Sequence, residues 1–491
     1  AGDAFNYDQK ETLDIGRKMN FDLLVFVTLF IVVANEAKVL NEKSNTCQDL
    51  LGDELIEEIW AYENVKDKIL NYVQDGDFKG KTYDELAKFV DKFGARPSGT
   101  LDLEQSIDYM IDLSRKEGLN EVITEEVEVP RWERGAEVLT MIEPRKKKME
   151  ILGLGKSVKT PLNGLTAEVV VISNFTHLEG TPDEKIKGKI VLYVPIFTTY
   201  SDTVIYRTQG AAKASAKGAV ASLVRSIAPF SIDSPHAGSQ TYNDDVEPIP
   251  AAAVTLEDAD LITRLHNRGE KVKLHLIMYS TLETAVSRNT LIDLKGYKDP
   301  EKLVIVSGHI DSWDVGQGAM DDGGGIFVSW AAPVILKRLN LIPRRTIRTI
   351  LWTAEELGLY GAHAYKKAHE DESHNINFIM ESDEGTFAPL GLVVGGNHKT
   401  RCIVAEVLKL FQSINASTLV ESDSPGSDIS IFTGNGIPGA SLHNDNGKYF
   451  WFHHTEGDTM NVETTENLDL GSAFWTAVAY IIADLSVDIP R

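Results

Sequence analysis

Side chains of the kinds that bind metal ions recur along the C-terminal half of this sequence. They are imidazoles and carboxylates, and the candidates are His309, Asp321, Glu355, Glu356, Asp383 and His454. Imidazole nitrogen and carboxylate oxygen together are a typical donor set for zinc at a hydrolytic site. Such a group could bind metal and activate water to break a bond. Whether these residues meet depends on the elements that carry them.

The segment around the first imidazole contains a further carboxylate. His309 lies in Gly-His-Ile-Asp-Ser-Trp-Asp, where Asp311 follows two residues later. A carboxylate at that position could accept the second N–H of the imidazole, which would fix the tautomer and raise the basicity of the ligand. We therefore expect Asp311 to support His309.

Asp321 and Asp322 lie in a glycine-rich segment, Gly-Ala-Met-Asp-Asp-Gly-Gly-Gly. Glycines beside a carboxylate let the backbone come close to an ion. One aspartate that bridges two cations could hold them roughly 3.5–4 Å apart. A calcium loop is the alternative, but the segment lacks the alternating oxygen ligands that calcium needs.

Two further segments place polar groups in pairs. Trp-Thr-Ala-Glu-Glu ends in Glu355 and Glu356, whose side chains should point in different directions, so that one can bind metal while the other stays free as a base. Near the C-terminus His453 and His454 are adjacent, and Asp458 follows. Each of these features alone is more typical of an ordinary surface or turn. Their occurrence together favours a site.

The elements after residue 289 predict how these side chains come together. Short apolar segments predict strands at 303–307, 346–352, 376–380 and 437–442. Helical periodicity predicts helices at 326–339, 358–369, 400–414 and 468–485. This alternation predicts an α/β fold with a mostly parallel sheet covered on both faces. The first three strands end near candidate ligands, and ligands bind at the carboxyl ends of such strands.

The preceding residues divide into two parts. Residues 48–125 are predicted to be helical, with Thr82-Tyr-Asp-Glu85 as a capping box. Residues 134–287 contain short β-type segments separated by glycine and proline, with an alanine-rich helix at 211–219. We interpret this second part as an inserted domain.

The composition excludes some functions. The net charge is −24, from 49 basic and 73 acidic residues, so a nucleic acid backbone would be repelled. The apolar run at 23–33 has 11 residues and is too short to cross a bilayer, which needs ~20. We predict a signal peptide at 19–37 and treat residues 1–18 as extraneous sequence. A buried or amphipathic N-terminal helix is the alternative.

Secretory transit agrees with two glycosylation sequons, at Asn174 and Asn415. The chain has two cysteines, Cys47 and Cys402, which are too few for a disulfide scaffold. The sequence leaves open whether they pair.

The order His, Asp, Glu-Glu, Asp, His resembles the co-catalytic dizinc exopeptidases of peptidase family M28, which includes bacterial leucyl aminopeptidases and glutamate carboxypeptidases. Matching stretches include Trp-Thr-Ala-Glu-Glu, Met-Glu-Ser-Asp and Tyr-Phe-Trp-Phe-His-His. The resemblance covers residues 80–490 and implies the zinc-exopeptidase fold with a β-rich protease-associated insert. The implied divisions are 38–134 for the N-terminal helical part, 135–287 for the insert and 288–491 for the dizinc catalytic domain.

The resemblance also implies a role for each candidate residue. His309 and Asp383 would bind one zinc ion, Glu356 and His454 the second, and Asp321 would bridge them. Glu355 would be the general base, with Asp311 beside it in the catalytic group. His454 is preferred to His453 because the family pattern counts back from Asp458. A cis peptide bond is implied at Asp321–Asp322.

The implied function is a dizinc metallo-exopeptidase that hydrolyses short peptides with free termini, chiefly dipeptides. The resemblance also implies a homodimer, with residence in the secretory pathway, lysosome, endoplasmic reticulum, Golgi or extracellular space. Two departures, Leu357 after the paired glutamates and Ile429 after Ser427-Asp428, affect substrate preference rather than metal ligands. The alternatives are an aminopeptidase on longer peptides, a glutaminyl cyclase and a non-catalytic receptor-like homologue.

Overall fold

The computed structural model describes residues 47–491. The predicted signal peptide at 19–37 and the sequence before it lie outside the described residues. Within the described part, no helix combines the length and apolar character that crossing a bilayer requires. Neither cysteine of this part is a free thiol.

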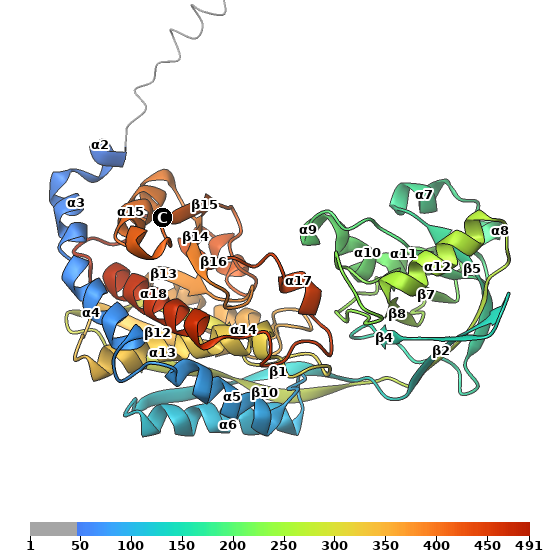
Figure 1. Ribbon diagram of the computed structural model, residues 1–491, viewed down its shortest axis with the longest axis horizontal. Coiled ribbons are helices and arrows are strands. Elements are labelled where there is room, and N and C mark those ends of the chain that lie inside the picture. Colours follow the sequence, from blue (N-terminus) through green and yellow to red (C-terminus); the bar gives the residue numbers. More distant parts are fainter. Residues whose placement is uncertain (1–46) are drawn as a thin grey trace, which may run out of the picture. The chain divides into compact units, whose positions relative to one another are not determined.

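A mixed sheet of eight strands forms the centre of the larger part of the structure (Figure 1). In spatial order its strands are β1 (Glu121–Glu133), β10 (Thr281–Leu294), β12 (Arg345–Trp352), β11 (Asp299–His309), β13 (Ile376–Glu381), β16 (Gly439–Asn444), β14 (Pro389–Gly395) and β15 (Thr418–Glu421). The central four, β12-β11-β13-β16, are mutually parallel, and antiparallel pairing appears only towards the two edges. The expected parallel core is therefore present within a sheet that is mixed overall.

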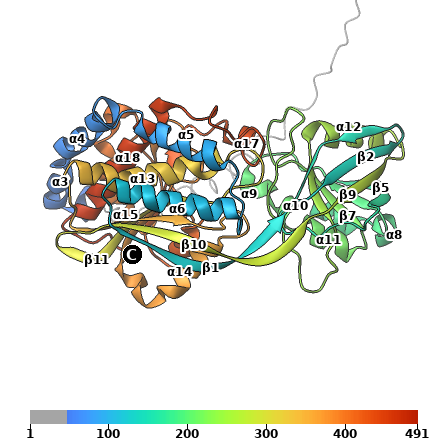
Figure 2. The same ribbon diagram turned by 90° about the horizontal axis from the view of Figure 1, so that it is seen from below.

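Helices cover this sheet on both faces, as Figure 2 shows for α13 and α14 on opposite sides of β1 and β10. α13 (Gly324–Arg338) and α18 (Thr465–Asp484) pack on each other and on β11 and β12. Both are buried along almost their whole length, because apolar side chains surround them on every side. The other helices of this part are α3 (Asp53–Trp60), α4 (Glu63–Gln74), α5 (Lys81–Phe93), α6 (Leu101–Lys116), α14 (Tyr360–Ala368), α15 (His398–Lys409), α16 (Ser430–Thr433) and α17 (Tyr449–Phe452).

A second mixed sheet of eight strands is built from the residues between β1 and β10. Its order is β3 (Lys147–Met149), β2 (Glu137–Glu143), β9 (Lys273–Met278), β5 (Leu165–Ile172), β6 (Ile190–Tyr193), β7 (Ala221–Arg225), β8 (Ala251–Val254) and β4 (Ile151–Gly153). Its helices include α7 (Phe175–Gly180), α9 (Tyr200–Thr203), α10 (Ile205–Thr208), α11 (Gly210–Ala216) and α12 (Leu256–Asn267). We call residues 137–278 the second lobe. Its identity as a protease-associated domain stays a prediction.

Three details differ from the sequence predictions. The region predicted to be helical, 48–125, ends as helix at Lys116, and its last residues belong to the edge strand β1, where Val127 and Val129 are buried and Glu128 between them faces solvent. β10 crosses the predicted boundary at 287–288. The capping box is wrong: α5 begins at Lys81, and Thr82 lies inside it with its hydroxyl 2.8 Å from that of Ser472.

Candidate metal centre

The candidate ligands gather at the carboxyl edge of the central parallel strands, as expected for a sheet of this kind. His309 is the last residue of β11, and Asp383 lies two residues beyond β13. Glu356 lies in the turn after β12, and His454 follows α17. Asp321 lies in the short turn Ala319–Gly323 that leads into α13, and its peptide bond to Asp322 is cis, which confirms that expectation.

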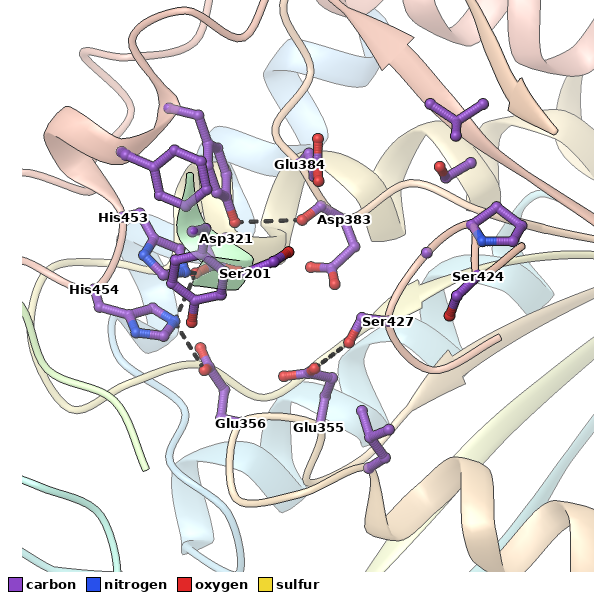
Figure 3. Close-up of a pocket in the computed structure, with 18 of the residues that line it drawn as sticks. Ser201, Asp321, Glu355, Glu356, Asp383, Glu384, Ser424, Ser427, His453 and His454 are labelled. Carbon is purple, nitrogen blue, oxygen red and sulfur yellow. Dashed lines mark hydrogen bonds and ion pairs between the residues drawn. The ribbon is translucent and has the colours of Figure 1, made fainter. Parts of the chain in front are cut away.

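The two oxygens of the Asp321 carboxylate face two different imidazoles. Oδ1 lies 3.2 Å from Nε2 of His309, and Oδ2 lies 3.2 Å from Nε2 of His454. The His309 nitrogen is also 3.1 Å from Oδ1 of Asp383, and the His454 nitrogen is 3.1 Å from Oε2 of Glu356. Asp321 thus joins two donor groups that have no other member in common, and Figure 3 shows Asp321 with His454 and Glu356 of one group.

Hydrogen bonds on the far side of each ring decide which nitrogen faces the carboxylates. Nδ1 of His309 lies 3.0 Å from the backbone oxygen of Asp311, and Nδ1 of His454 lies 3.1 Å from that of Ala237. A carbonyl oxygen only accepts, so in the neutral rings Nδ1 carries the hydrogen. Nε2 of each ring then directs a lone pair at carboxylate oxygens, an arrangement that a cation between them would stabilise.

The remaining geometry also fits metal ions. Oδ2 of Asp321 and Oε1 of Glu356 are buried without a hydrogen-bond partner among the described residues. Donors ~2.0–2.1 Å from a tetrahedral zinc ion lie roughly 3.3 Å from one another, close to the separations within both groups. Two cations sharing Asp321 would therefore satisfy atoms that the protein alone leaves unpaired.

Asp311 supports the site differently from the expectation. Its carboxylate oxygen lies 3.6 Å from Nδ1 of His309, too far for a hydrogen bond, and the backbone oxygen of the same residue takes that role. The carboxylate instead accepts hydrogen bonds from the backbone N–H groups of Glu355 at 3.0 Å and Glu356 at 3.3 Å. Asp311 therefore positions the paired glutamates.

Glu355 is not part of either donor group. Its carboxylate accepts a hydrogen bond from the hydroxyl of Ser427, and both residues line the same pocket, which has a volume of about 470 Å³. Burial raises the pKa of Glu355 to about 7. The side chain faces the open space between the donor groups and Ser427 in Figure 3, where a base would have to lie.

A loop near the C-terminus positions the backbone of Asp321. Oδ1 of Asp458 accepts from the backbone N–H groups of Ala319 at 3.1 Å and Met320 at 2.8 Å, and Oδ2 accepts from that of Asp321 at 3.2 Å. The segment that carries His454 therefore also carries Asp458, which fixes the turn that contains Asp321.

The fully buried Arg96 holds the same region from the other side. Its guanidinium donates to the backbone oxygens of Ile310, Gln317 and Gly318. These residues flank the ligands on β11 and in the following turn. The helical N-terminal part therefore contributes to the site, which the sequence did not predict.

The electrostatics of the centre are dominated by buried acids. Burial raises the pKa of Glu356 and of Asp383 to about 7, and burial together with Asp383 raises that of Glu381 to about 8. Burial disfavours the charged form of His309, but the surrounding carboxylates, Asp383 foremost, together outweigh this and raise the pKa of His309 well above its usual value. An excess of buried negative charge suits bound cations.

The second lobe also contributes to the pocket. Nδ1 of His236 donates to the backbone oxygen of His453 at 2.7 Å, and the backbone N–H of Ala237 donates to that of His454 at 2.9 Å. The ring of His453 stacks on that of His454 with centroids 3.5 Å apart, and its Nε2 is 3.6 Å from Oδ2 of Asp321. No local motif indicated these long-range contacts.

Both predicted glycosylation sites are exposed. Asn174 precedes α7 and caps it by accepting from the backbone N–H of His177 at 2.7 Å. Asn415 lies in a turn with a positive φ of 58°.

Comparisons with known proteins show which family the sequence matches. Residues 289–478 match the model of peptidase family M28. The chain is 47% identical to carboxypeptidase Q of Xenopus laevis, over 88% of this chain and 92% of that protein, and 46% identical to carboxypeptidase Q of Homo sapiens, over 89% and 93%.

Solved structures also match. A peptidase M28 precursor from Shewanella amazonensis superposes with a TM-score of 0.84 at 29% identity, over 88% of this chain and 99% of that chain. A zinc aminopeptidase from Bacillus subtilis has a TM-score of 0.63 at 23% identity, over 84% and 99%, which supports the fold.

Proposed function

The chain belongs to peptidase family M28 and is a zinc metallopeptidase, and we propose that it is a dizinc exopeptidase hydrolysing short peptides with free ends, dipeptides above all. The observation that carries the proposal is the division of the Asp321 carboxylate between two donor groups. His309 and Asp383 would hold one zinc ion, and Glu356 and His454 the other. The complete donor set argues against a non-catalytic receptor-like homologue.

The residues around the donor groups suggest a mechanism for peptide hydrolysis. Zinc bound there would supply a Lewis acid that polarises the scissile carbonyl and makes water more acidic. Glu355 would take a proton from the attacking water and return it to the leaving amine. Ser427 orients this carboxylate, and Asp311 holds the backbone that carries it. Proton transfer by Glu355 is thus the step that the protein itself performs.

The pocket supports a short substrate. It encloses about 470 Å³ and is lined by the second lobe as well as by the ends of the central strands. Aromatic side chains of the two parts meet beside it, with the rings of Tyr200 and Phe450 stacked at 5.1 Å. A pocket of this volume, with aromatic rings beside it, favours binding of a peptide end over binding of the middle of a long chain. We further propose secretory, lysosomal or extracellular residence, which the predicted leader and the sequons support, and a homodimer, which the family resemblance implies.

An aminopeptidase acting on longer peptides is the second candidate. It is favoured by Glu384, whose carboxylate lines the pocket beside Asp383 and could bind an ammonium group. Digestion of a mixed library of free, N-blocked and C-amidated peptides, followed by mass spectrometry, separates the two. The proposal expects cleavage of dipeptides with both ends free, whereas efficient cleavage of long C-amidated peptides would favour the alternative.

A further inference from the structure

A second pocket lies in the second lobe and is separate from the candidate metal centre. It encloses about 400 Å³ and shares none of its lining residues with the pocket that contains the metal ligands. Most of its lining is apolar and consists of Val194, Pro195, Ile196, Phe197, Ala228 and Pro229. A concave, largely apolar site of this volume with a few polar groups is the usual form of a small-molecule site.

The pocket lies at the carboxyl edge of the parallel strands of the second sheet. β5, β6, β7 and β8 are mutually parallel. Val194 directly follows β6, and Arg225 is the last residue of β7. α12, which follows β8, contributes Asp260 and Thr263 to the lining. Ligands bind at this edge of open parallel sheets, so the position of the pocket also favours a ligand site.

Arg225 and Asp260 form an ion pair that leaves most of their hydrogen-bonding capacity unused. Nε of Arg225 lies 3.3 Å from Oδ1 of Asp260, which is long for a hydrogen bond between charged groups. Neither side chain makes another hydrogen bond within residues 47–491. A guanidinium has five N–H donors, and a carboxylate has two acceptor oxygens. Both Nη groups of Arg225 and Oδ2 of Asp260 are therefore left for a ligand.

The apolar part of the pocket is open to solvent. Ile196 is 84% exposed, although it is a large aliphatic side chain. Phe197 beside it is held in place by Phe450, with 5.7 Å between the ring centroids. Removing apolar surface from water is favourable. An aliphatic or aromatic group in the pocket would therefore be bound more tightly than a polar one.

We propose that this pocket binds a free α-amino acid with an apolar side chain. The ligand carboxylate accepts hydrogen bonds from the Nη groups of Arg225, its ammonium group donates to Oδ2 of Asp260, and its side chain packs on Ile196 and Phe197. The site goes beyond the proposed peptidase function and does not depend on it. A free amino acid is also what an exopeptidase would release.

The two charges of the pocket favour a zwitterion over a simple ion. A ligand with only a negative charge would pair with Arg225 but would be repelled by Asp260. A ligand with only a positive charge would meet the opposite problem. An α-amino acid carries both charges on neighbouring groups and satisfies both residues without breaking their own pair.

The test measures binding of L-leucine to the zinc-loaded protein by isothermal titration calorimetry. Arg225→Met and Asp260→Asn each remove one charge of the pair. Arg268→Met is the matched control, because Arg268 lies in the same lobe, pairs with Glu270 at 3.0 Å and does not line the pocket. Binding common to all four proteins belongs to the catalytic pocket, and binding lost only in the first two variants belongs to this one.

Arg225→Met and Asp260→Asn should each weaken this binding by roughly 10- to 100-fold, as expected for loss of a hydrogen bond to a charged group. Arg268→Met should bind leucine as wild type does. Leucinamide, N-acetyl-leucine and glycine lack, in turn, the carboxylate, the ammonium group and the apolar side chain. Each should occupy this pocket more weakly than leucine.

Crystals of the wild-type protein soaked with free L-selenomethionine locate the ligand without any variant. Anomalous diffraction should place selenium beside Ile196 and Phe197. Unchanged leucine affinity in both charge variants, or selenium at the catalytic pocket alone, would overturn the proposal. Absence of leucine binding, together with a dimer that Ile196→Ser dissociates, would show that a second copy of the chain covers the pocket and would overturn it as well.

Hydrolysis plays no part in these measurements, so the two proposals fail separately. A protein that binds leucine here but hydrolyses no dipeptide would support this site and refute the proposed function. A protein that hydrolyses dipeptides but binds no leucine here would do the reverse.

Discussion

Glu355 and Glu356 are neighbours in the chain, but their carboxylates reach opposite sides of the pocket. Glu356 lies 3.1 Å from Nε2 of His454, whereas Glu355 accepts a hydrogen bond from Ser427. One aspartate, Asp311, accepts from the backbone N–H groups of both. In the proposed mechanism this divergence would separate the group that holds metal, Glu356, from the group that moves protons, Glu355.

Replacing Glu355 by Gln should lower kcat by at least 10²-fold, because general acid–base assistance typically contributes 10²–10⁴-fold. Zinc content and folding should stay normal. The matched variant Glu356→Gln should lose affinity for one zinc ion as well as activity. Steady-state kinetics and elemental analysis of both variants check this. If Glu355→Gln loses metal while Glu356→Gln keeps it, the two assignments are interchanged.

Replacing Asp458 by Asn should weaken zinc binding by roughly 10- to 100-fold, the usual effect of removing a group that orients a metal ligand. The amide nitrogen would face backbone N–H groups of the turn that carries Asp321, where the carboxylate now accepts. Titration with a competing chelator measures the affinity.

The control for this variant is Glu456→Gln, two residues away, because Glu456 accepts only from the backbone N–H of Gly316 at 3.1 Å. It should bind zinc as wild type does. Equal affinity of wild type and Asp458→Asn would mean that the turn is held by other contacts.

His309, Glu356 and Asp383 could be anticipated from sequence because each lies at or just beyond the end of a strand with a strong apolar pattern. Asp321 and His454 do not follow a strand directly, and their assignment came from the family resemblance. The partners of His454 could not be anticipated, since Ala237 lies in the second lobe and reaches it only through folding. The role of Arg96 could not be anticipated either, because its partners at Ile310, Gln317 and Gly318 are far from it in the sequence.

The central strands were placed within a few residues, but the edge of the sheet was missed. β1 carries glutamates at half of its positions near Val127, which weakens any strand pattern in the sequence. Its thirteen residue pairs with β10 stabilise it as a strand, although its own sequence has weak strand propensity. The start of α5 was misplaced because the residue before the helix is Gly80, whose N–H donates to Asp469 on α18, and Thr82 does not act as the cap.

Dialysis against a strong chelator should abolish peptide hydrolysis, and added zinc should restore it. The reason is that Nε2 of His309 and Nε2 of His454 each point at carboxylate oxygens. The lone pairs and negative charges there repel one another unless a cation or a proton lies between them. Activity assays with parallel elemental analysis provide the readout. Full activity in protein shown to be free of metal would refute zinc catalysis.

Expression of the full chain in eukaryotic cells should give a glycoprotein that loses mass on enzymatic deglycosylation. Both sequon asparagines are exposed, so each is accessible to the transferase. Asn174→Gln and Asn415→Gln should each remove one glycan, and the double variant should remove all the glycan. A cytosolic product of unmodified mass would contradict secretory transit.

The most direct test of the account is the number and position of zinc ions. Elemental analysis of zinc-saturated protein, combined with anomalous diffraction at the zinc edge, measures both. We predict two ions per chain, one beside each oxygen of Asp321, with His309 on one and His454 on the other. A single ion, or two ions that do not share Asp321, would contradict the dizinc centre.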